Sequence, residues 1–224
     1  MSINDDLLNA FQMALGQLIT PTLTSASDTS DLFEGYVLGV ILDAAAEEGA
    51  TIEYRDVRDN LTTQFTFRSS PGYIFSQEQP YSHAVIAFQR CPALEAHIGI
   101  RVAGRSDVLH ECDVAVLHRT EAATCRASRV HPRAAKVILA VECKFYGTPL
   151  KLGLGRSFMG LGSDLGANAS YIVVNTASAT MEKLLTYHKR QWEHDVKPSS
   201  TIAVMRLRNT FQKVFKNFIA RNRP

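Results

Sequence analysis

The chain has 224 residues, of which 46% are hydrophobic and 21% charged, and its formal net charge at pH 7 is +2. This length and composition suffice for one sizeable hydrophobic core, so we expect a single domain. A net charge this close to zero neither requires nor excludes a polyanionic partner. No apolar run approaches the roughly 20 residues that a bilayer-spanning helix needs. We therefore expect no membrane attachment.

The cysteines and the N-terminal residues favour a reduced compartment. Four cysteines are present, without a Cys-x-x-Cys spacing, and neither Cys112 nor Cys143 has a histidine at the spacing of a known zinc motif. The first 18 residues include Asp5 and Asp6 and lack the basic start and apolar run of a secretory signal. We expect a cytoplasmic protein.

Two helices are predicted in the first fifty residues. Apolar residues recur at helical spacing within residues 5–19, and a Ser/Thr-rich linker follows at 22–29. The second helix would use Ser30 as its N-cap and end at Gly49. Glu34 lies in its first turn, at the margin of an apolar stripe. An acid there either simply complements the helix dipole or serves a site.

The middle of the chain has the alternation and turn signals of β-structure. Residues 51–57 and 62–68 predict a hairpin, and further strands are expected at 81–88, 94–102 and 108–117. In the strand at 94–102, apolar residues alternate with polar ones that include Glu95 and His97, which predicts a half-exposed strand.

Helices and strands alternate in the second half. A buried strand at 137–145 is followed by elements at helical or strand spacing: a helix at 153–166, a strand at 171–174, a helix at 181–192, a strand at 201–207 and a helix at 209–220. We expect one α/β domain with a mixed central sheet, made of an N-terminal helix and linker (1–29), a core (30–207) and a basic C-terminal helix (208–224).

Two apolar strands end in charged residues, which a buried strand rarely tolerates without a reason. Side chains alternate along a strand, so Glu111 and Asp113 share one face, as do Glu142 and Lys144. Strands adjacent in sequence usually pair in the sheet. Asp113, Glu142 and Lys144 are therefore predicted to converge.

Such a group suits metal-assisted chemistry on a phosphate. Two carboxylates would hold Mg²⁺ at about 2 Å, and the ion would lower the pKa of a bound water. Lys144 would orient that water or stabilise charge in the transition state. Without a cation, the two carboxylates would repel each other and their pKa values would rise.

The arrangement of Asp113, Glu142-Cys143-Lys144 and an acid on an upstream helix resembles the PD-(D/E)xK, or restriction-endonuclease-like, nucleases. The resemblance implies an αβββαβ core and an endodeoxyribonuclease. It also implies that Asp113 and Glu142 bind Mg²⁺ (Mn²⁺ as a substitute), that Lys144 acts on the attacking water, and that Glu34 completes the site. The chain departs from the pattern in having Cys112 where the family often has proline.

Two further features leave alternatives open. Glu47 and Glu48 are rivals to Glu34 as the helix acid. The segment between the two charged strands, 118–136, is longer than a tight hairpin and would be a β-extension or a flexible arm.

Basic residues near the predicted site are candidates for phosphate contacts. They are Lys151 and Arg156, around the start of the helix after the second strand, and Arg119, Arg126 and Arg129 in the long connecting segment. Such a run is also typical of an ordinary solvated face. The C-terminal helix is expected to pack on the domain or a second subunit, with contact to DNA or a membrane surface as the alternative.

The expected partner is DNA, with double-stranded DNA favoured over single-stranded DNA. The expected biological setting is restriction, phage defence or repair. Cutting both strands needs two sites, so a homodimer or higher oligomer is expected. The alternatives are a catalytically inactive nucleic-acid-binding or assembly module on the same fold, and a hydrolase of another phosphodiester.

Overall fold

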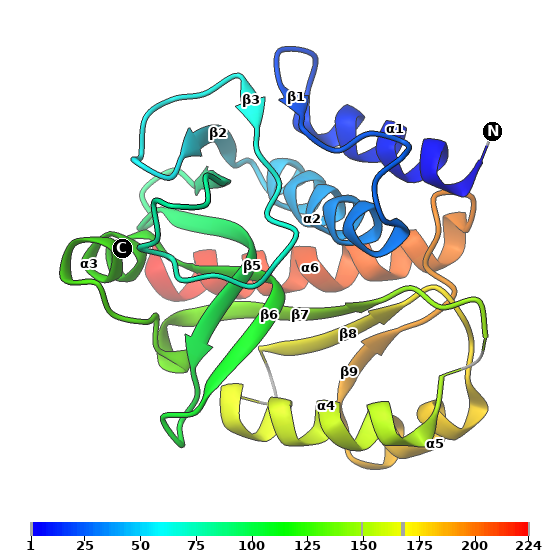
Figure 1. Ribbon diagram of the computed structural model, residues 1–224. Helices are drawn as coiled ribbons and strands as arrows, with labels where there is room; N and C mark the ends of the chain where they lie inside the picture. The colour runs from blue at the N-terminus through cyan, green and yellow to red at the C-terminus, as the bar shows by residue number, and fades with distance from the viewer. Residues whose placement is uncertain (1, 149, 167–168, 224) are drawn as a thin grey trace.

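The computed structural model describes residues 2–148, 150–166 and 169–223. A mixed seven-stranded sheet lies at its centre with helices on both faces, in the strand order β2-β4-β5-β6-β7-β8-β9 (Figure 1). The sheet strands are β2 (Thr51–Asp56), β4 (Ser82–Ala87), β5 (Leu94–Ala103), β6 (Leu109–His118), β7 (Val137–Lys144), β8 (Ser170–Val174) and β9 (Gln191–Glu193). The helices are α1 (Ile3–Leu15), α2 (Thr29–Glu47), α3 (Arg119–Ser128), α4 (Leu152–Leu165), α5 (Ala179–Tyr187) and α6 (Thr201–Asn222). The α/β class with a mixed central sheet is confirmed.

The direction of pairing changes at β7. Each pair of sheet neighbours from β2 to β7 is antiparallel, whereas β7, β8 and β9 run parallel to one another. Parallel strands need a crossover connection, which α4 and α5 supply. Residues at the ends of β6 and β7 therefore lie at the junction of the two halves.

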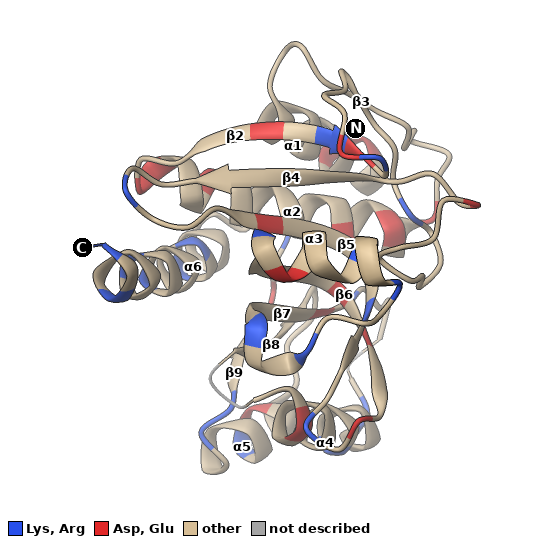
Figure 2. Ribbon diagram, turned by 90° about the vertical axis from the view of Figure 1, so that its left-hand side faces the viewer, with Lys and Arg blue, Asp and Glu red and all other residues tan. Residues whose placement is uncertain are grey.

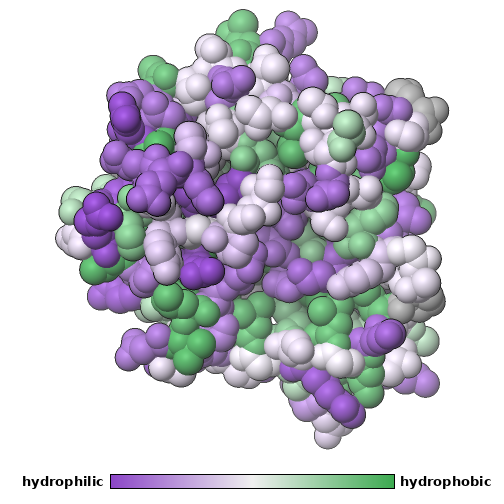
Figure 3. All heavy atoms as spheres, in the orientation of Figure 1, coloured by the Kyte–Doolittle hydropathy of each residue, from purple (hydrophilic) through white to green (hydrophobic). Residues whose placement is uncertain are grey.

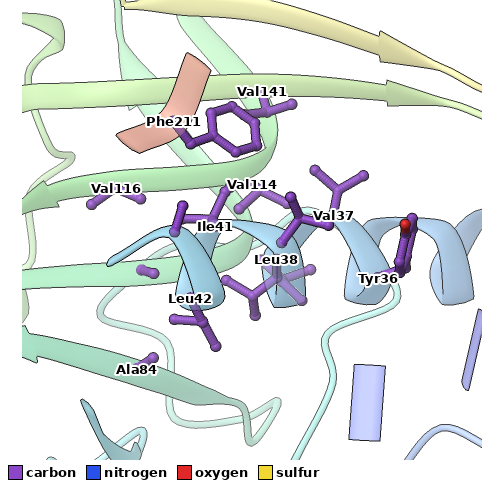
Figure 4. Close-up of a cluster of buried hydrophobic side chains, with 14 of the residues drawn as sticks. Tyr36, Val37, Leu38, Ile41, Leu42, Ala84, Val114, Val116, Val141 and Phe211 are labelled. Atoms are coloured by element: carbon purple, nitrogen blue, oxygen red, sulfur yellow. The ribbon is translucent and has the colours of Figure 1, made fainter. Parts of the chain in front are cut away.

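The larger core lies between the sheet and α2, with α1 and α6 packed on the same side. Val37, Leu38 and Ile41 of α2 lie beside Val114 and Val141 of the sheet (Figure 4). Because α2 is apolar almost all round, it is buried on several sides, as expected of a central helix. This packing fixes the position of the N-terminal half of α2. Glu34 lies in its second turn, not in the first turn as expected, where the acid is Asp31.

The opposite face of the sheet is covered by α3, α4 and α5. Ala122 and Cys125 of α3 pack with residues of β6 and β7, while Phe158 of α4 and Met181 of α5 pack on β8. A Cβ on Gly155 of α4 would lie only 2.6 Å from the Met181 sulfur, so the absence of a side chain permits this close approach.

Several sequence-based boundaries are wrong. The hairpin of 51–57 with 62–68 does not form as a strand pair: β2 pairs with β4, and the short β3 (Gln64–Phe65) pairs in parallel with β1 (Thr20–Pro21). Only a single bridge, Arg55 with Leu61, remains of it. The turn at Asp59, whose φ is +66°, is held by Asp56, which leaves the second arm free to turn away.

The long connection 118–136 is neither a β-extension nor a flexible arm. It folds as α3 followed by a 3₁₀ turn at Ala134–Lys136. α3 covers the face of β5 that carries Glu95 and His97, so both side chains are fully buried rather than half-exposed. The prediction that polar and apolar residues of β5 lie on opposite faces was correct. An alternating pattern does not show, however, whether another element covers the polar face.

The C-terminal elements also differ. The strand expected at 201–207 and the helix at 209–220 are one helix, α6, whose buried residues Leu207, Phe211, Phe215 and Phe218 recur every three or four positions. The helix expected at 181–192 ends at Tyr187, after which Gln191–Glu193 forms the edge strand β9. The second helix begins at Thr29, one residue before the expected cap, with Asp28 as N-cap.

On the face shown in Figure 3, hydrophilic residues alternate with hydrophobic areas. Lysine and arginine positions are frequent along α6, while α2 carries acidic positions (Figure 2). Cys112, Cys125 and Cys143 are buried and Cys91 is half-buried, all as free thiols. Among the residues described, no helix combines the length and apolar character needed to span a bilayer.

Candidate active site

Asp113, in the middle of β6, meets Glu142 and Lys144 at the C-terminal end of β7. The Lys144 ammonium Nζ lies 2.8 Å from Glu142 Oε1 and 3.1 Å from Asp113 Oδ2. The three side chains line one cavity. The predicted convergence of these residues is therefore confirmed as geometry.

The sheet itself makes room for these charges. The β6–β7 ladder runs only as far as Val114 paired with Val141, although both strands continue beyond that pair. Past it, the Cys143 N–H donates to Asp113 Oδ2 at 2.7 Å, so a carboxylate replaces the missing ladder partner. Asp113 is consequently held by two donors, one from backbone and one from Lys144.

The cavity has a volume of about 280 Å³ and lies between the sheet and α4. Its lining residues are Glu111, Asp113, Glu142, Lys144, Leu154, Ser157, Phe158 and Leu161. The floor is thus charged and the α4 wall is mostly apolar. A water molecule takes about 30 Å³ in the liquid, so the space admits a small group with several waters.

The charged groups of this site also affect the pKa of Glu34. Burial raises the pKa of Glu34 from 4.5 to about 9, and the negative charge of Asp113 adds to the effect. The rival acids lie elsewhere, because Glu47 accepts hydrogen bonds from Arg208 and Gln212 of α6. Glu48 lies 3.4 Å from Lys216 of the same helix. Glu34 does not line the cavity itself, although the charges of Asp113 and Lys144 act on its pKa, whereas Glu47 and Glu48 pair with residues of α6.

The site contains more negative charge than its lysine can balance. Burial raises the pKa of Glu142, and the charge of Asp113 raises it further. Burial alone would lower the pKa of Lys144, but the charges of Asp113 and Glu142 outweigh that effect and raise it. Lys144 is therefore firmly cationic, and a further cation in the cavity would favour the charged forms of Glu34 and Glu142.

The donor set fits a hard divalent cation. Among the described residues, no group donates a hydrogen bond to Oδ1 of Asp113 or Oε2 of Glu142, so each carboxylate keeps one oxygen for a metal. Carboxylate oxygens with water are the ligands that Mg²⁺ prefers. The excess negative charge around the cavity gives such an ion an electrostatic reason to bind.

Glu111 and Asp31 belong to the surroundings of this site and had no predicted role. Glu111 lines the cavity, and burial raises its pKa with help from Asp113. Asp31, one helical turn before Glu34, contributes to the raised pKa of Glu34. Sequence spacing could have indicated both residues. Glu111 lies two positions before Asp113 on the same strand, and Asp31 lies three positions before Glu34 on the same helix.

A polar clamp joins α4 to the β5–β6 turn beside the cavity. Asp164 accepts hydrogen bonds from His110 Nε2 at 2.6 Å and from the Ser106 N–H at 2.8 Å. These contacts hold the pKa of Asp164 down, at about 2. His110 is thus a hydrogen-bonded residue that holds α4 in place, as expected of an edge histidine.

The predicted phosphate-binding residues divide into two groups. Both η nitrogens of Arg126 donate to Glu95, and Arg119 Nη2 donates to Asp59, so these two guanidiniums are engaged in ion pairs. In contrast, Lys151, Arg156 and Arg129 are exposed. Lys151 is the N-cap residue of α4, at the end of the loop that leaves β7.

No family model matches this chain, and no curated protein or solved structure matches it either.

Proposed function

We propose that the protein is a Mg²⁺-dependent endodeoxyribonuclease with a restriction-endonuclease-like core. The observation that carries this proposal is the contact of one lysine with two carboxylates, Lys144 with Asp113 and Glu142, on adjacent strands. If β2, β3, β4 and α3 are taken as additions to the core, the remaining elements α2, β5, β6, β7, α4 and β8 are compatible with the αβββαβ order implied by the resemblance.

Each residue has a distinct part in the proposed reaction. Asp113 and Glu142 would hold Mg²⁺, which supplies Lewis-acid stabilisation of the phosphate and lowers the pKa of a water. Lys144 orients the attacking water and offsets negative charge that develops on the phosphate. Glu34 supports the ion from the α2 side. The apolar wall of α4 limits the access of other water.

Exposed cations around the cavity supply the DNA-binding surface in this proposal. Lys151 and Arg156 lie at the N-terminal end of α4, where backbone N–H groups also favour an anion. Arg129 is exposed as well, but it lines a separate pocket with Tyr73 and Phe75, so its contact with DNA stays a prediction. Phosphate contacts of this kind weaken as salt rises. Cutting a duplex on both strands would require two such sites, and therefore two copies of the chain.

A plasmid-nicking assay tests the proposal. Supercoiled and linear DNA are incubated with the purified protein in Mg²⁺, in Mn²⁺ and in EDTA, and products are separated by electrophoresis. We expect nicking or linearisation with either metal and none in EDTA. Lys144→Ala should abolish cleavage, whereas Lys183→Ala, which removes an exposed lysine of α5, should not.

Three outcomes of these experiments would change the proposed function. If the wild-type protein and Lys144→Ala leave DNA equally intact, the nuclease proposal is rejected. If gel-shift experiments then show that both still bind DNA, a non-hydrolytic binding module is the better assignment. Cleavage of RNA or of a small phosphodiester alone would redirect the substrate class while retaining the site.

A further inference from the structure

A second cluster of metal-ligating side chains lies under α3, and it shares no residue with the candidate active site. It consists of His83 on β4 and of Glu95 and His97 on β5, each with no accessible surface. One ligand atom from each lies within 4.8 Å of the others. Asp59, from the turn after β2, approaches the same group.

Three spacings between ligand atoms are close to those of a tetrahedral metal site, while Asp59 lies outside the group of three whose atoms are all within 4.8 Å of one another. His97 Nε2 lies 3.0 Å from Glu95 Oε2, and His83 Nε2 lies 3.7 Å from that oxygen and 3.4 Å from Asp59 Oδ1. Around zinc, with nitrogen and oxygen ligands at about 2.0–2.1 Å, tetrahedral geometry places neighbouring ligand atoms about 3.3 Å apart. The three observed distances bracket that value.

The cluster also leaves buried polar atoms without partners. Among the described residues, Nδ1 and Nε2 of His83, Nδ1 of His97 and Oδ1 of Asp59 are buried and make no hydrogen bond. A buried polar atom without a partner destabilises the folded state. Two of these atoms, His83 Nε2 and Asp59 Oδ1, face each other, which is where an ion between them would satisfy both.

The two histidines lie side by side on the paired strands β4 and β5. A neutral imidazole has a lone pair for a cation. The two rings are stacked, with their centroids 4.9 Å apart.

We propose that His83, His97, Glu95 and Asp59 bind one transition-metal ion of the zinc class. Imidazole nitrogens select zinc and its neighbours over Mg²⁺, which prefers oxygen ligands alone. The ion would join the turn after β2 to β4 and β5. Its role would be structural, because all three central ligands lie beneath α3, away from solvent.

Two arginines hold the outer oxygens of the carboxylates and thereby aim the inner ones. Arg126 Nη2 donates to Glu95 Oε1 at 2.8 Å, and Arg119 Nη2 donates to Asp59 Oδ2 at 2.8 Å. Glu95 Oε2 and Asp59 Oδ1 are the oxygens that face the imidazoles. Arg126 Nη1 also donates to Glu95 Oε2 at 2.7 Å, and His97 Nε2 is hydrogen-bonded to the same oxygen at 3.0 Å. Both bonds must be released on metal binding. Orienting contacts of this kind to the ligands are a regular feature of protein metal sites.

Metal content and cobalt spectroscopy test the inference. Both use a Glu142→Gln background, which weakens the candidate active site as a competing cation site. After EDTA treatment and desalting, the protein is titrated with Zn²⁺ or Co²⁺. We expect about one tightly held ion per chain, visible Co²⁺ absorption of the four-coordinate type, and a rise in melting temperature with Zn²⁺.

Variants distinguish this site from adventitious binding. His83→Gln and, should that variant fold poorly, Asp59→Asn are expected to lose the cobalt spectrum and the zinc-dependent stabilisation. His131→Gln, which changes a histidine outside the cluster, should retain both. The inference is overturned if the folded parent binds no more zinc than His83→Gln or Asp59→Asn, or if its cobalt complex has only the weak absorption of an octahedral oxygen site.

Discussion

Lys144 Nζ lies 3.1 Å from Asp113 Oδ2, so the residue that ends β7 holds the carboxylate of β6 at the point where the two strands stop pairing. The same ammonium lies 2.8 Å from Glu142, on its own strand. A single cation thus offsets two buried acids from adjacent strands. Removing the Lys144 ammonium would leave the charges of Asp113 and Glu142 unbalanced. Even a substitution that keeps the shape of a side chain but changes its charge should therefore affect the site.

Asp113→Asn should reduce Mg²⁺-dependent DNA cleavage by about 100-fold or more, comparable to losing one strong electrostatic contact in a transition state. The amide keeps the shape of the side chain but not the charge that would hold the metal. Initial nicking rates across a Mg²⁺ titration measure both the rate and the apparent metal affinity. Asp107→Asn, in the exposed β5–β6 turn, is the matched control and should leave both unchanged. Equal losses in the two variants would contradict the assignment of Asp113.

Glu34→Gln should stabilise the metal-free protein at pH 8. The pKa of Glu34 is raised from 4.5 to about 9 in the folded state, so folding favours the protonated carboxyl. Stability from this group is complete below its unfolded pKa and is lost as the pH rises toward about 9. Glutamine is neutral throughout, so we expect a gain of at least about 1 kcal/mol at pH 8, the equivalent of one pKa unit.

Urea unfolding in EDTA at pH 5 and pH 8 measures this difference. The gain of Glu34→Gln should be much smaller at pH 5, where the folded wild type is already protonated at Glu34. Glu47→Gln, at the other end of α2, should show no gain because Glu47 accepts hydrogen bonds from α6. A pH-independent difference would show that the charge of Glu34 is not the cause.

Gly155→Ala should destabilise the protein by about 1–3 kcal/mol, the usual cost of overpacking. The new Cβ would lie 2.6 Å from Met181 Sδ and 2.9 Å from Leu184 Cδ2, so α4 and α5 would have to separate. Gly160→Ala is a control in the same helix, because nothing lies within 4 Å of its added Cβ. That variant should be stabilised by up to about 1 kcal/mol. Thermal or urea unfolding compares them, and similar effects at both positions would refute the packing argument.

Asp164→Asn should lower the melting temperature and also slow DNA cleavage, because it weakens the clamp that holds α4 over the cavity. The pKa of Asp164 is lowered to about 2, so its stabilising effect is present above the ordinary value of 3.8 and is lost as the pH falls toward 2. The difference in melting temperature between the wild type and the variant should therefore be larger at pH 7 than at pH 3. An unchanged melting temperature at pH 7 would show that the clamp is not needed.

The convergence of Asp113, Glu142 and Lys144 could be predicted from the sequence alone. Alternation along each strand assigns the faces, and sequence neighbours usually pair, so the outcome required no distant contact. The burial of Glu95 and His97 was missed because a periodic pattern does not reveal that α3 lies over it. The unity of α6 was missed because residues 201–207 are rich in β-branched and aliphatic residues that suit either structure. Tertiary packing of Leu207 and Phe211 against the core decides for the helix.

The sheet order also bears on how the site assembles during folding. β5, β6 and β7 are consecutive strands along the chain and neighbours in the sheet, so the strands that carry Asp113 and Glu142 are closer in sequence to each other than either is to α2. Contacts that close short loops form sooner than those that close long ones. Glu34 comes from α2 and joins only when that distant helix docks. We expect the two carboxylates on β6 and β7 to meet early, before the third acid arrives, and amide exchange measured during refolding should show protection of β5 and β6 ahead of α2.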